Sequence, residues 1–506
     1  MAAEKARPDC SCGPALADVR RRLMDDFPML NAMRTRRPMY VEKLVKVVRD
    51  CAEYNERYVM PVALEIDRRM EHDHDYFAWD LVQAALPYRL LSLAIPGLVG
   101  GVGGLSVMFS LAMEELCSAC PGIGNIFGAH ALGVSPFLVA GSMAHWESAL
   151  RDCAESEKAG KPVLMAAAVT EPSAGTDVEE PNFLKTARLS MGAKKVAGGY
   201  VINGTKCFIS NGSVADYTVL CCATDRDRPF ESWTTFIITK DMEGFSVPRV
   251  EEKMGQRACP AAELLFEDCF VPDENVMGME GDGMQPGTLL LLAASRAPVG
   301  AIATGISRSA YEWFVKWANR ARAGGMRPID RQSVQMAIAD MKTRIQLARW
   351  AYLNAALTFD GSLGNVMNSP VTKSLAFMPR SVRTGDQFKK FFLSNAGKQM
   401  TEALIAAHTS SAAVTHALAN ASMAKAVGGD TAMYISTLAL EMMGIEDSEE
   451  RPWIEKAFRD AKLTQIYEGT NQLNRLVLFE AGIQKSLKIE LKNPLGFGRK
   501  GGGPRG

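Results

Sequence analysis

The spacing of hydrophobic residues changes twice along the chain and divides it into three regions. In the first region, about 40–143, apolar residues such as Leu44, Val48 and Cys51 recur every three or four positions. This is the spacing of amphipathic helices that bury one face. The first region is therefore predicted to be helical.

In the second region, which starts near Val163, short β-prone runs alternate with turn residues. The pairs Asn203-Gly204 and Asn211-Gly212 are expected to form turns between strands. The spacing of the runs predicts an antiparallel β-domain of roughly 115 residues. The predicted strands are Val163–Thr170, Tyr200–Ile202, Lys206–Ser210, Tyr217–Ala223, Thr234–Thr239 and Ala262–Phe266.

Helical spacing returns after Gly287 and fills the third region. The order helix, strand, helix predicts an α+β protein with an N-terminal helical domain, a central antiparallel β-domain and a C-terminal helical bundle. The segments predicted to be helices are Leu289–Ala323, Ser333–Phe359, Ala421–Met443 and Trp453–Ile466.

The same changes of pattern give the expected domain bounds. They are an N-terminal extension at 1–39, a helical domain at 40–160, the β-domain at 161–278, a second helical domain at 279–487 and a flexible tail at 488–506.

The charge balance and the apolar runs narrow the possible partners. Lys plus Arg and Asp plus Glu each number 57, so the chain has no overall field to attract nucleic acid or acidic membranes. The longest apolar runs, near 81–113 and 288–305, are interrupted by Arg, Pro or Gly. They are expected to be buried helices and loops rather than membrane spans.

Eleven cysteines are spread without a regular framework, and the six histidines form no ligand set beside them. This usage is typical of reduced thiols in a cytoplasmic protein and favours no metal site. The segment Met1–Pro8 lacks the apolar core of a secretory signal.

Four motifs stand in a fixed order on this background: Val169–Asp177 (VTEPSAGTD), Lys253–Asp268, Val271–Val276 and Gln465–Arg475 (QIYEGTNQLNR). Together they resemble the acyl-CoA dehydrogenases, over residues from about 40 to 485. The resemblance implies an enzyme that desaturates an acyl thioester between its α and β carbons. In that family a base removes the α-proton while a hydride leaves for a bound flavin, FAD.

The resemblance places the base at Glu468. A thioester α C–H is too weak an acid for a carboxylate in water, so the site has to raise the pKa of the base and stabilise the enolate oxygen. Taken alone, Glu468 would be read as an acid at a helix start. Some relatives place the base where this chain has Ser295, and serine cannot replace a carboxylate.

Other residues are assigned to the ligands by the same resemblance. The backbone N–H of Glu468 and a flavin hydroxyl are expected to hold the thioester carbonyl, with Tyr467 beside the substrate and Gly469 allowing a tight turn. Arg296 is expected in the CoA pocket; alone, it would be read as a solvated helix charge.

The flavin is expected to lie against two strand ends. Val169, Thr170 and Ser210 resemble residues that bond the flavin ring, and Phe208 stands where the family usually has a tryptophan. Without the motif, the two hydroxyls would be read as ordinary strand-end residues and Phe208 as a strand core residue. The residues expected near the pyrophosphate, CoA arm and adenosine half are Gly175, Thr176, Thr470 and Gln472.

Two elements that usually bind the adenosine half of FAD across a subunit interface are altered. In Arg320–Gly325 the usual phenylalanine is lost, and the arginine position is Ala321 or Arg322, depending on the register. In Leu440–Glu446 only Gly444 survives, and Met443 and Glu446 would crowd and repel a pyrophosphate. These changes indicate altered subunit pairing, a differently held adenosine, or a heteromer completed by a sister chain.

An insertion at about 361–412 also separates this chain from the family pattern. A structureless loop of that size would be unusual, so added helices are expected, with 364–370 turn-like and 386–414 helical. The expected partners are an acyl-CoA and an electron-transfer flavoprotein, with assembly as a homotetramer, a dimer or a heteromer. The rival functions are an acyl-CoA oxidase and a flavin-poor partner subunit of a heteromeric dehydrogenase.

Overall fold

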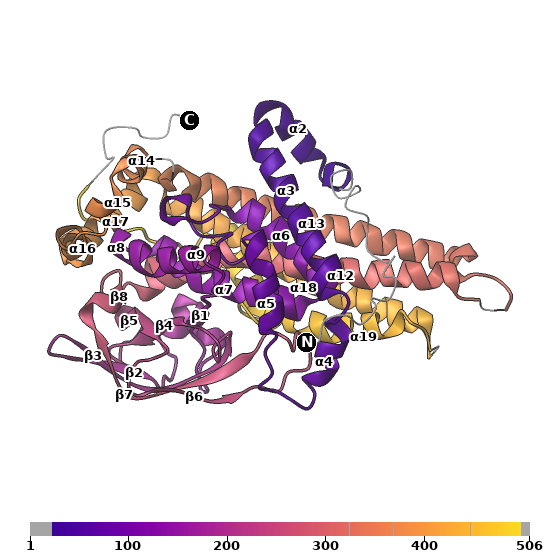
Figure 1. Cartoon of the computed structure of the whole chain (residues 1–506), viewed down its shortest axis with the longest axis horizontal. Helices are drawn as coiled ribbons and strands as arrows, with labels where there is room; N and C mark the ends of the chain where they lie inside the picture. The colour runs from indigo at the N-terminus through magenta and orange to yellow at the C-terminus, as the bar shows by residue number, and fades with distance from the viewer. Residues whose placement is uncertain (1–22, 323, 368, 446, 497–506) are drawn as a thin grey trace.

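A computed structural model of the chain describes residues 23–322, 324–367, 369–445 and 447–496. The predicted order of helices, strands and helices is confirmed (Figure 1). The two sheets lie below the helices in Figure 1, and the long C-terminal helices extend away from them.

The N-terminal helices pack onto the C-terminal bundle. In α3, the residues Val41, Leu44, Val48 and Cys51 are all buried, as their helical spacing predicts. Helices α6 and α7 lie against α12. The bounds are α2 (Pro28–Arg36), α3 (Pro38–Tyr54), α4 (Ala63–Arg69), α5 (Trp79–Ala85), α6 (Ser106–Ala119), α7 (Pro121–Val139), α8 (Met143–His145) and α9 (Arg151–Lys158).

The β-domain consists of two four-stranded sheets, ordered β1-β4-β5-β8 and β2-β3-β7-β6. Most pairs are antiparallel, but β1 pairs with β4 in parallel. A parallel pair needs a long crossover, and here the crossover carries β2 and β3 of the other sheet. The strands are β1 (Met165–Ala168), β2 (Gly192–Val196), β3 (Gly199–Ser210), β4 (Tyr217–Ala223), β5 (Trp233–Thr239), β6 (Phe245–Val250), β7 (Ala261–Pro272) and β8 (Val276–Met277).

The prediction of a turn at Asn203-Gly204 is wrong. Both residues lie inside β3, where the register with β7 shifts between Ile202 and Gly204. Gly204 has a φ of +130°, and a Cβ there would stand 2.7 Å from the Cα of Met191. The glycine therefore makes a β-bulge, whereas Asn211 does begin a turn, with a φ of +60°.

The C-terminal bundle is built on α12, which packs against α18, α13 and α19. The predicted helices are present with different ends, and the predicted end Ala323 lies outside the described residues. The bounds are α12 (Leu289–Arg320), α13 (Gln332–Met367), α18 (Ser411–Met443), α19 (Arg451–Thr464) and α20 (Asn471–Val477).

The segment from 361 to 412 contains added helices that lie at the left end of Figure 1. Residues 364–367, expected to be turn-like, continue α13. The stretch expected to be one helix from residue 386 breaks at Ser394, which caps the next helix by accepting a bond from Gly397 N at 3.3 Å. The bounds are α14 (Pro370–Phe377), α15 (Arg380–Arg383), α16 (Asp386–Leu393) and α17 (Asn395–His408).

The start of the tail, which was expected to be flexible, is anchored to α18. Residues 1–22 and 497–506 lie outside the described part, but α2 and the start of the tail are anchored. Ile489 N donates to Thr415 Oγ1 at 2.8 Å, and Leu491 N donates to Ser411 Oγ at 3.2 Å. The prediction of a flexible tail is therefore wrong for its first residues.

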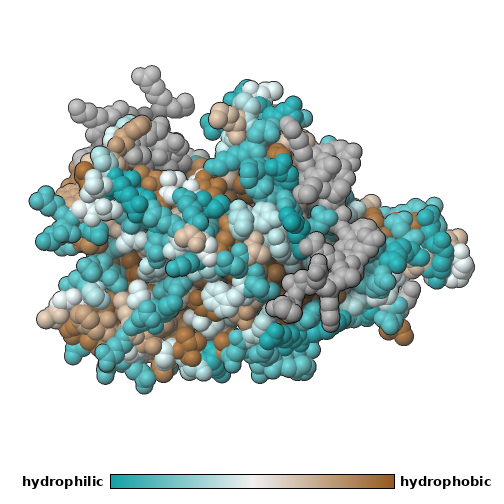
Figure 2. All heavy atoms as spheres, viewed as in Figure 1, coloured by the Kyte–Doolittle hydropathy of each residue, from teal (hydrophilic) through white to brown (hydrophobic). Residues whose placement is uncertain are grey.

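The longest apolar helices and the cysteine side chains are buried inside the fold. Two helices, Pro121–Val139 and Gly283–Arg320, are long and apolar enough to cross a membrane, but 72% and 89% of their apolar windows are buried inside the fold. The nine cysteines among the described residues are free and buried. Hydrophilic residues cover most of the face in Figure 2, with hydrophobic ones showing between them.

Candidate active site

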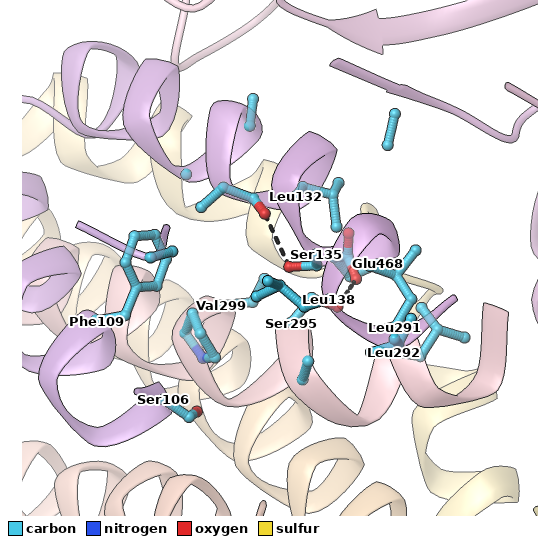
Figure 3. A pocket seen from close by; sticks show the side chains of 18 of the residues that line it. Ser106, Phe109, Leu132, Ser135, Leu138, Leu291, Leu292, Ser295, Val299 and Glu468 are labelled. Atoms are coloured by element: carbon cyan, nitrogen blue, oxygen red, sulfur yellow. Dashed lines mark hydrogen bonds between the residues drawn. The ribbon is translucent and has the colours of Figure 1, made fainter. Parts of the chain in front are cut away.

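A cavity of about 800 Å³ lies where the helical domains meet the β-domain. Its wall is mostly apolar, and Figure 3 shows Leu132 and Leu138 of α7 facing Leu291 and Val299 of α12. Leu363, Val366 and Ile405 add to this wall from the end of α13 and from α17. The segment from 361 to 412 thus helps to close the cavity.

Most of the predicted site residues line this one cavity, although they come from three separate stretches of sequence. Arg296, Gly469 and Gln472 are not part of its wall, and Gln472 is exposed to solvent. The predicted residues that do line the cavity are Val169, Thr170, Gly175, Thr176, Phe208, Ser210, Tyr467, Glu468 and Thr470.

Glu468 presents its carboxyl group to the cavity from the turn between α19 and α20. Ser295 Oγ donates a hydrogen bond to Glu468 Oε2 at 2.5 Å (Figure 3). Burial raises the pKa of Glu468, while the Ser295 hydrogen bond and the charges of Arg296 and Lys425 lower it. Because burial is the largest influence, the group has the raised proton affinity that a carboxylate base requires.

The two carbonyl groups of the catalytic turn are held from within the protein. Glu468 O accepts from Arg296 Nε at 3.1 Å, and Gly469 O accepts from Lys425 Nζ at 2.6 Å. Asn474 Nδ2 donates to both oxygens, at 3.2 and 2.9 Å. Within the described part of the chain, the N–H of Glu468 donates to no residue, so it is available to a ligand.

Position 469 requires glycine because of its backbone angle and because there is no room for a side chain. Its φ is +75°, next to a φ of +55° at Glu468, a region that favours glycine. A Cβ at Gly469 would lie 2.7 Å from Glu179 Oε2 and 2.9 Å from a methyl group of Leu473. The expected tight turn is thus present, and Gly469 shapes it from behind the cavity wall.

Arg296 is neither a cavity residue nor a solvated charge. Its side chain is fully buried behind the catalytic turn. Nη1 donates to Ser422 Oγ at 2.9 Å and Nη2 to Glu179 Oε2 at 3.3 Å. In this structure Arg296 supports Glu468 from behind the cavity wall, and its expected place in a CoA pocket stays a prediction.

Two strand ends come together on the β-domain side of the cavity. Cys207 N donates to Thr170 O at 3.1 Å, which joins the end of β1 to β3. Lys206, itself buried, donates to Val169 O at 2.7 Å and to Glu171 at 3.1 Å. These bonds hold the two strand ends together, and Thr170 and Ser210 both line the cavity.

Phe208 lies in the cavity wall with 62% of its surface exposed. Its φ of +59° is uncommon for an aromatic residue. The unusual backbone directs the ring toward the cavity rather than into the core of the sheet.

Several polar residues of the site lie outside the sequence motifs and were not predicted. Glu179, Asp360 and Ser106 line the cavity, and Lys425 is fully buried beside it. For Lys425 a signal existed, because a lysine among small apolar residues of a predicted helix has to be buried with a partner.

The elements expected near the adenosine half of FAD are engaged within the chain. Arg320 pairs with Glu449 and Glu450 at 2.9 and 3.0 Å, while Arg322 is exposed. The Met443 side chain is buried in the helical core, and its expected crowding of a pyrophosphate stays a prediction. Glu446 lies outside the described residues.

The site thus combines a buried carboxyl group with a cavity that two helical domains and the β-domain enclose. Family models match the three acyl-CoA dehydrogenase domains in order: N-terminal at 42–157, middle at 166–269 and C-terminal at 283–377 and 395–483. The chain belongs to the acyl-CoA dehydrogenase family.

Relatives agree with this assignment along most of the chain. The sequence is 32% identical to cyclohex-1-ene-1-carbonyl-CoA dehydrogenase of Syntrophus aciditrophicus, over 86% of this chain and 87% of that protein. It is 30% identical to a short-chain-specific acyl-CoA dehydrogenase of Clostridium acetobutylicum, over 84% and 94%.

Two solved structures share the fold and are more than 25% identical to this chain in sequence. Butyryl-CoA dehydrogenase of Megasphaera elsdenii has a TM-score of 0.68 at 26% identity and covers 87% of this chain and 97% of that one. A chain in a structure described as the electron transferring flavoprotein of Acidaminococcus fermentans has a TM-score of 0.70 at 28% identity, covering 88% and 98%. The C-terminal family model leaves 378–394 unmatched, which contains α15 and α16.

Proposed function

We propose that this chain binds FAD and oxidises an acyl-CoA thioester to the 2-enoyl-CoA, with Glu468 removing the α-proton. One observation supports this more than any other. A buried carboxyl group with a raised pKa faces a ligand-sized cavity, and its own backbone N–H is available beside it.

The residues around the cavity are suited to a flavin ring. The hydroxyl of Thr170 makes no hydrogen bond among the described residues, and Ser210 lies on the same wall. Phe208 offers an aromatic face, and a Cβ at Gly175 would meet nothing within 4 Å, so backbone there is open to a phosphate group. Bound FAD would accept the hydride that leaves the β-carbon.

The acid–base step depends on the residues of this chain. Glu468 would take the α-proton, and its burial reduces the difference in acidity between the carboxyl group and the C–H bond. The enolate oxygen would accept a hydrogen bond from the backbone N–H of Glu468. The apolar wall shields this site from water. Ser295 and Arg296 hold the carboxyl group and the backbone of the base in place.

The apolar wall is the part of the site that would select the acyl chain. Leu363, Val366 and Ile405 of the added segment line the cavity, and we expect it to take short, medium-length or cyclic acyl groups. The direct test is the absorption spectrum of the purified protein with a series of straight-chain and cyclic acyl-CoA thioesters. Bleaching of the flavin bands would support the proposal, and no bleaching with any thioester would contradict it.

Reduced flavin is expected to pass its electrons to an electron-transfer flavoprotein. The similarity to a chain in a structure described by that name supports this expectation. Steady-state oxidation of an active acyl-CoA should therefore require the added acceptor protein and produce little hydrogen peroxide in air. Rapid peroxide formation that the acceptor does not affect would indicate an acyl-CoA oxidase instead.

A homo-oligomer that binds FAD is the expected assembly, with a heteromer as the alternative. Arg320 is paired with Glu449 and Glu450, so a contact between Arg320 and the adenosine half of FAD would compete with these two ion pairs. Native mass spectrometry of the chain expressed alone should show dimers or tetramers with one FAD per chain. Flavin-poor protein that gains FAD only with a sister chain would identify a partner subunit.

A further inference from the structure

A second carboxyl group lines the cavity and has no part in the proposed chemistry. Glu179 ends the short η5 helix (Thr176–Glu179), which begins within the VTEPSAGTD motif. Its side chain is only 15% exposed, and it belongs to the same cavity wall as Glu468. An acid in such a place costs free energy unless a cation compensates it.

Glu179 is connected to the base through Arg296. Its Oε2 atom accepts from Arg296 Nη2 at 3.3 Å, while Nε of the same guanidinium donates to Glu468 O at 3.1 Å. The same Oε2 atom stands 2.7 Å from the place where a Cβ of Gly469 would be. Glu179 therefore packs directly against the catalytic turn.

The charged groups around Glu179 come from three elements, and their positive and negative charges balance. Arg296 of α12 and Lys425 of α18 favour its ionised form, and Glu468 of the turn disfavours it. Burial is the largest influence and raises the pKa of Glu179 to about 7. Burial and Arg296 lower the pKa of Lys425 to about 7. The site thus holds groups that change charge near neutral pH.

We propose that Glu179 is a positioning residue that fixes Arg296 against the carbonyl of Glu468 and sets the pH at which Glu468 acts as the base. This inference rests on the proposed function, because it needs Glu468 as the base. When ionised, Glu179 aligns Arg296 and repels negative charge on Glu468. Protonation of Glu179 weakens both its alignment of Arg296 and its repulsion of Glu468. The two carboxyl groups therefore titrate as a coupled pair.

The test compares Glu179→Gln, Glu179→Asp and the control Glu180→Gln. Glu180 is the adjacent buried carboxyl group, but it caps α10 (Pro181–Leu184) by accepting from Phe183 N at 2.8 Å. The first readout is the infrared band of protonated carboxyl groups, followed against pH with no substrate present. The second is the pH profile of kcat/KM for the active acyl-CoA.

In Glu179→Gln the coupling between the two carboxyl groups is lost, so the titration of Glu468 and the acidic limb of kcat/KM should move to lower pH. Glu179→Asp keeps the charge but shortens the reach to Arg296, so a smaller shift is expected. Glu180→Gln should leave both profiles unchanged.

Four results would overturn the inference or separate it from the proposed function. An unchanged Glu468 band in Glu179→Gln would overturn the inference, as would an equal shift in Glu180→Gln. Loss of folded protein in both glutamine and aspartate variants, with an unchanged profile in the remainder, would show that Glu179 is only structural. Full activity in Glu468→Gln would instead remove the proposed base, while the infrared titration would still report whether the two groups are coupled.

Discussion

Replacement of Glu468 by glutamine is expected to slow acyl-CoA-dependent flavin reduction by at least about a hundredfold, the usual effect of removing a general base. The amide has the same shape and can still accept the hydrogen bond from Ser295 Oγ, which is 2.5 Å from Glu468 Oε2. It cannot take up a proton at neutral pH. Stopped-flow absorbance of the flavin bands measures the rate directly.

The variant should keep its FAD and its fold, because Arg296, Lys425 and Asn474 hold the backbone of the turn rather than its carboxyl group. Glu441→Gln, an exposed change on α18, is a matched control that should retain the full rate. A Glu468→Gln rate within about tenfold of the unchanged protein, roughly 1.4 kcal/mol in barrier height, would exclude Glu468 as the base.

The sequence predicted the order of domains because periodicity is a local property. Val41, Leu44 and Val48 are buried on one face of α3, and their spacing alone identifies that face. The motifs and the family resemblance identified the residues of the site. Thr170, Ser210 and Glu468 are far apart in sequence, yet all three line one cavity.

Features that depend on contacts between distant segments could not be predicted in this way. The parallel pairing of β1 with β4 and the bulge at Gly204 depend on the other strands. Burial of Arg296 depends on Glu179 and Ser422, which come from different domains. A helical arginine has the same local pattern whether it faces solvent or a buried carboxylate, so the contacts of Arg296 behind the catalytic turn could not be predicted from the sequence.

The largest expected effect on stability comes from Glu114 of α6, which joins three helices in the core. Its carboxyl group accepts from Arg349 Nη2 at 2.7 Å, Tyr352 Oη at 2.6 Å and Arg308 Nη1 at 3.3 Å. Burial opposes its charge, but Arg349 and Arg308 lower the pKa of Glu114 to about 2. Relative to an ordinary glutamate, this shift corresponds to about 3 kcal/mol of folding free energy at pH 7.

Glu114→Gln is therefore expected to lower the free energy of unfolding by about 3 kcal/mol at pH 7, because it leaves two buried arginines short of negative charge. Asp26 still pairs with Arg349, and Glu115 with Arg308, which keeps the loss from being larger. Glu312→Gln is the matched control: Glu312 contacts the same Arg308 at 3.4 Å but is 46% exposed, so its loss should cost less than about 1 kcal/mol.

The sign of the pH dependence gives a second test of Glu114. A carboxyl group with a lowered pKa in the folded state stabilises the fold above its unfolded pKa, and this contribution is lost as pH falls toward the folded value. For Glu114 the window runs from 4.5 down to about 2. Urea unfolding at pH 7 and pH 4 should therefore show a difference between the unchanged protein and Glu114→Gln that is roughly 1 kcal/mol smaller at pH 4. A difference that grows on acidification, or one below about 1 kcal/mol at pH 7, would mean that the arginines are compensated without Glu114.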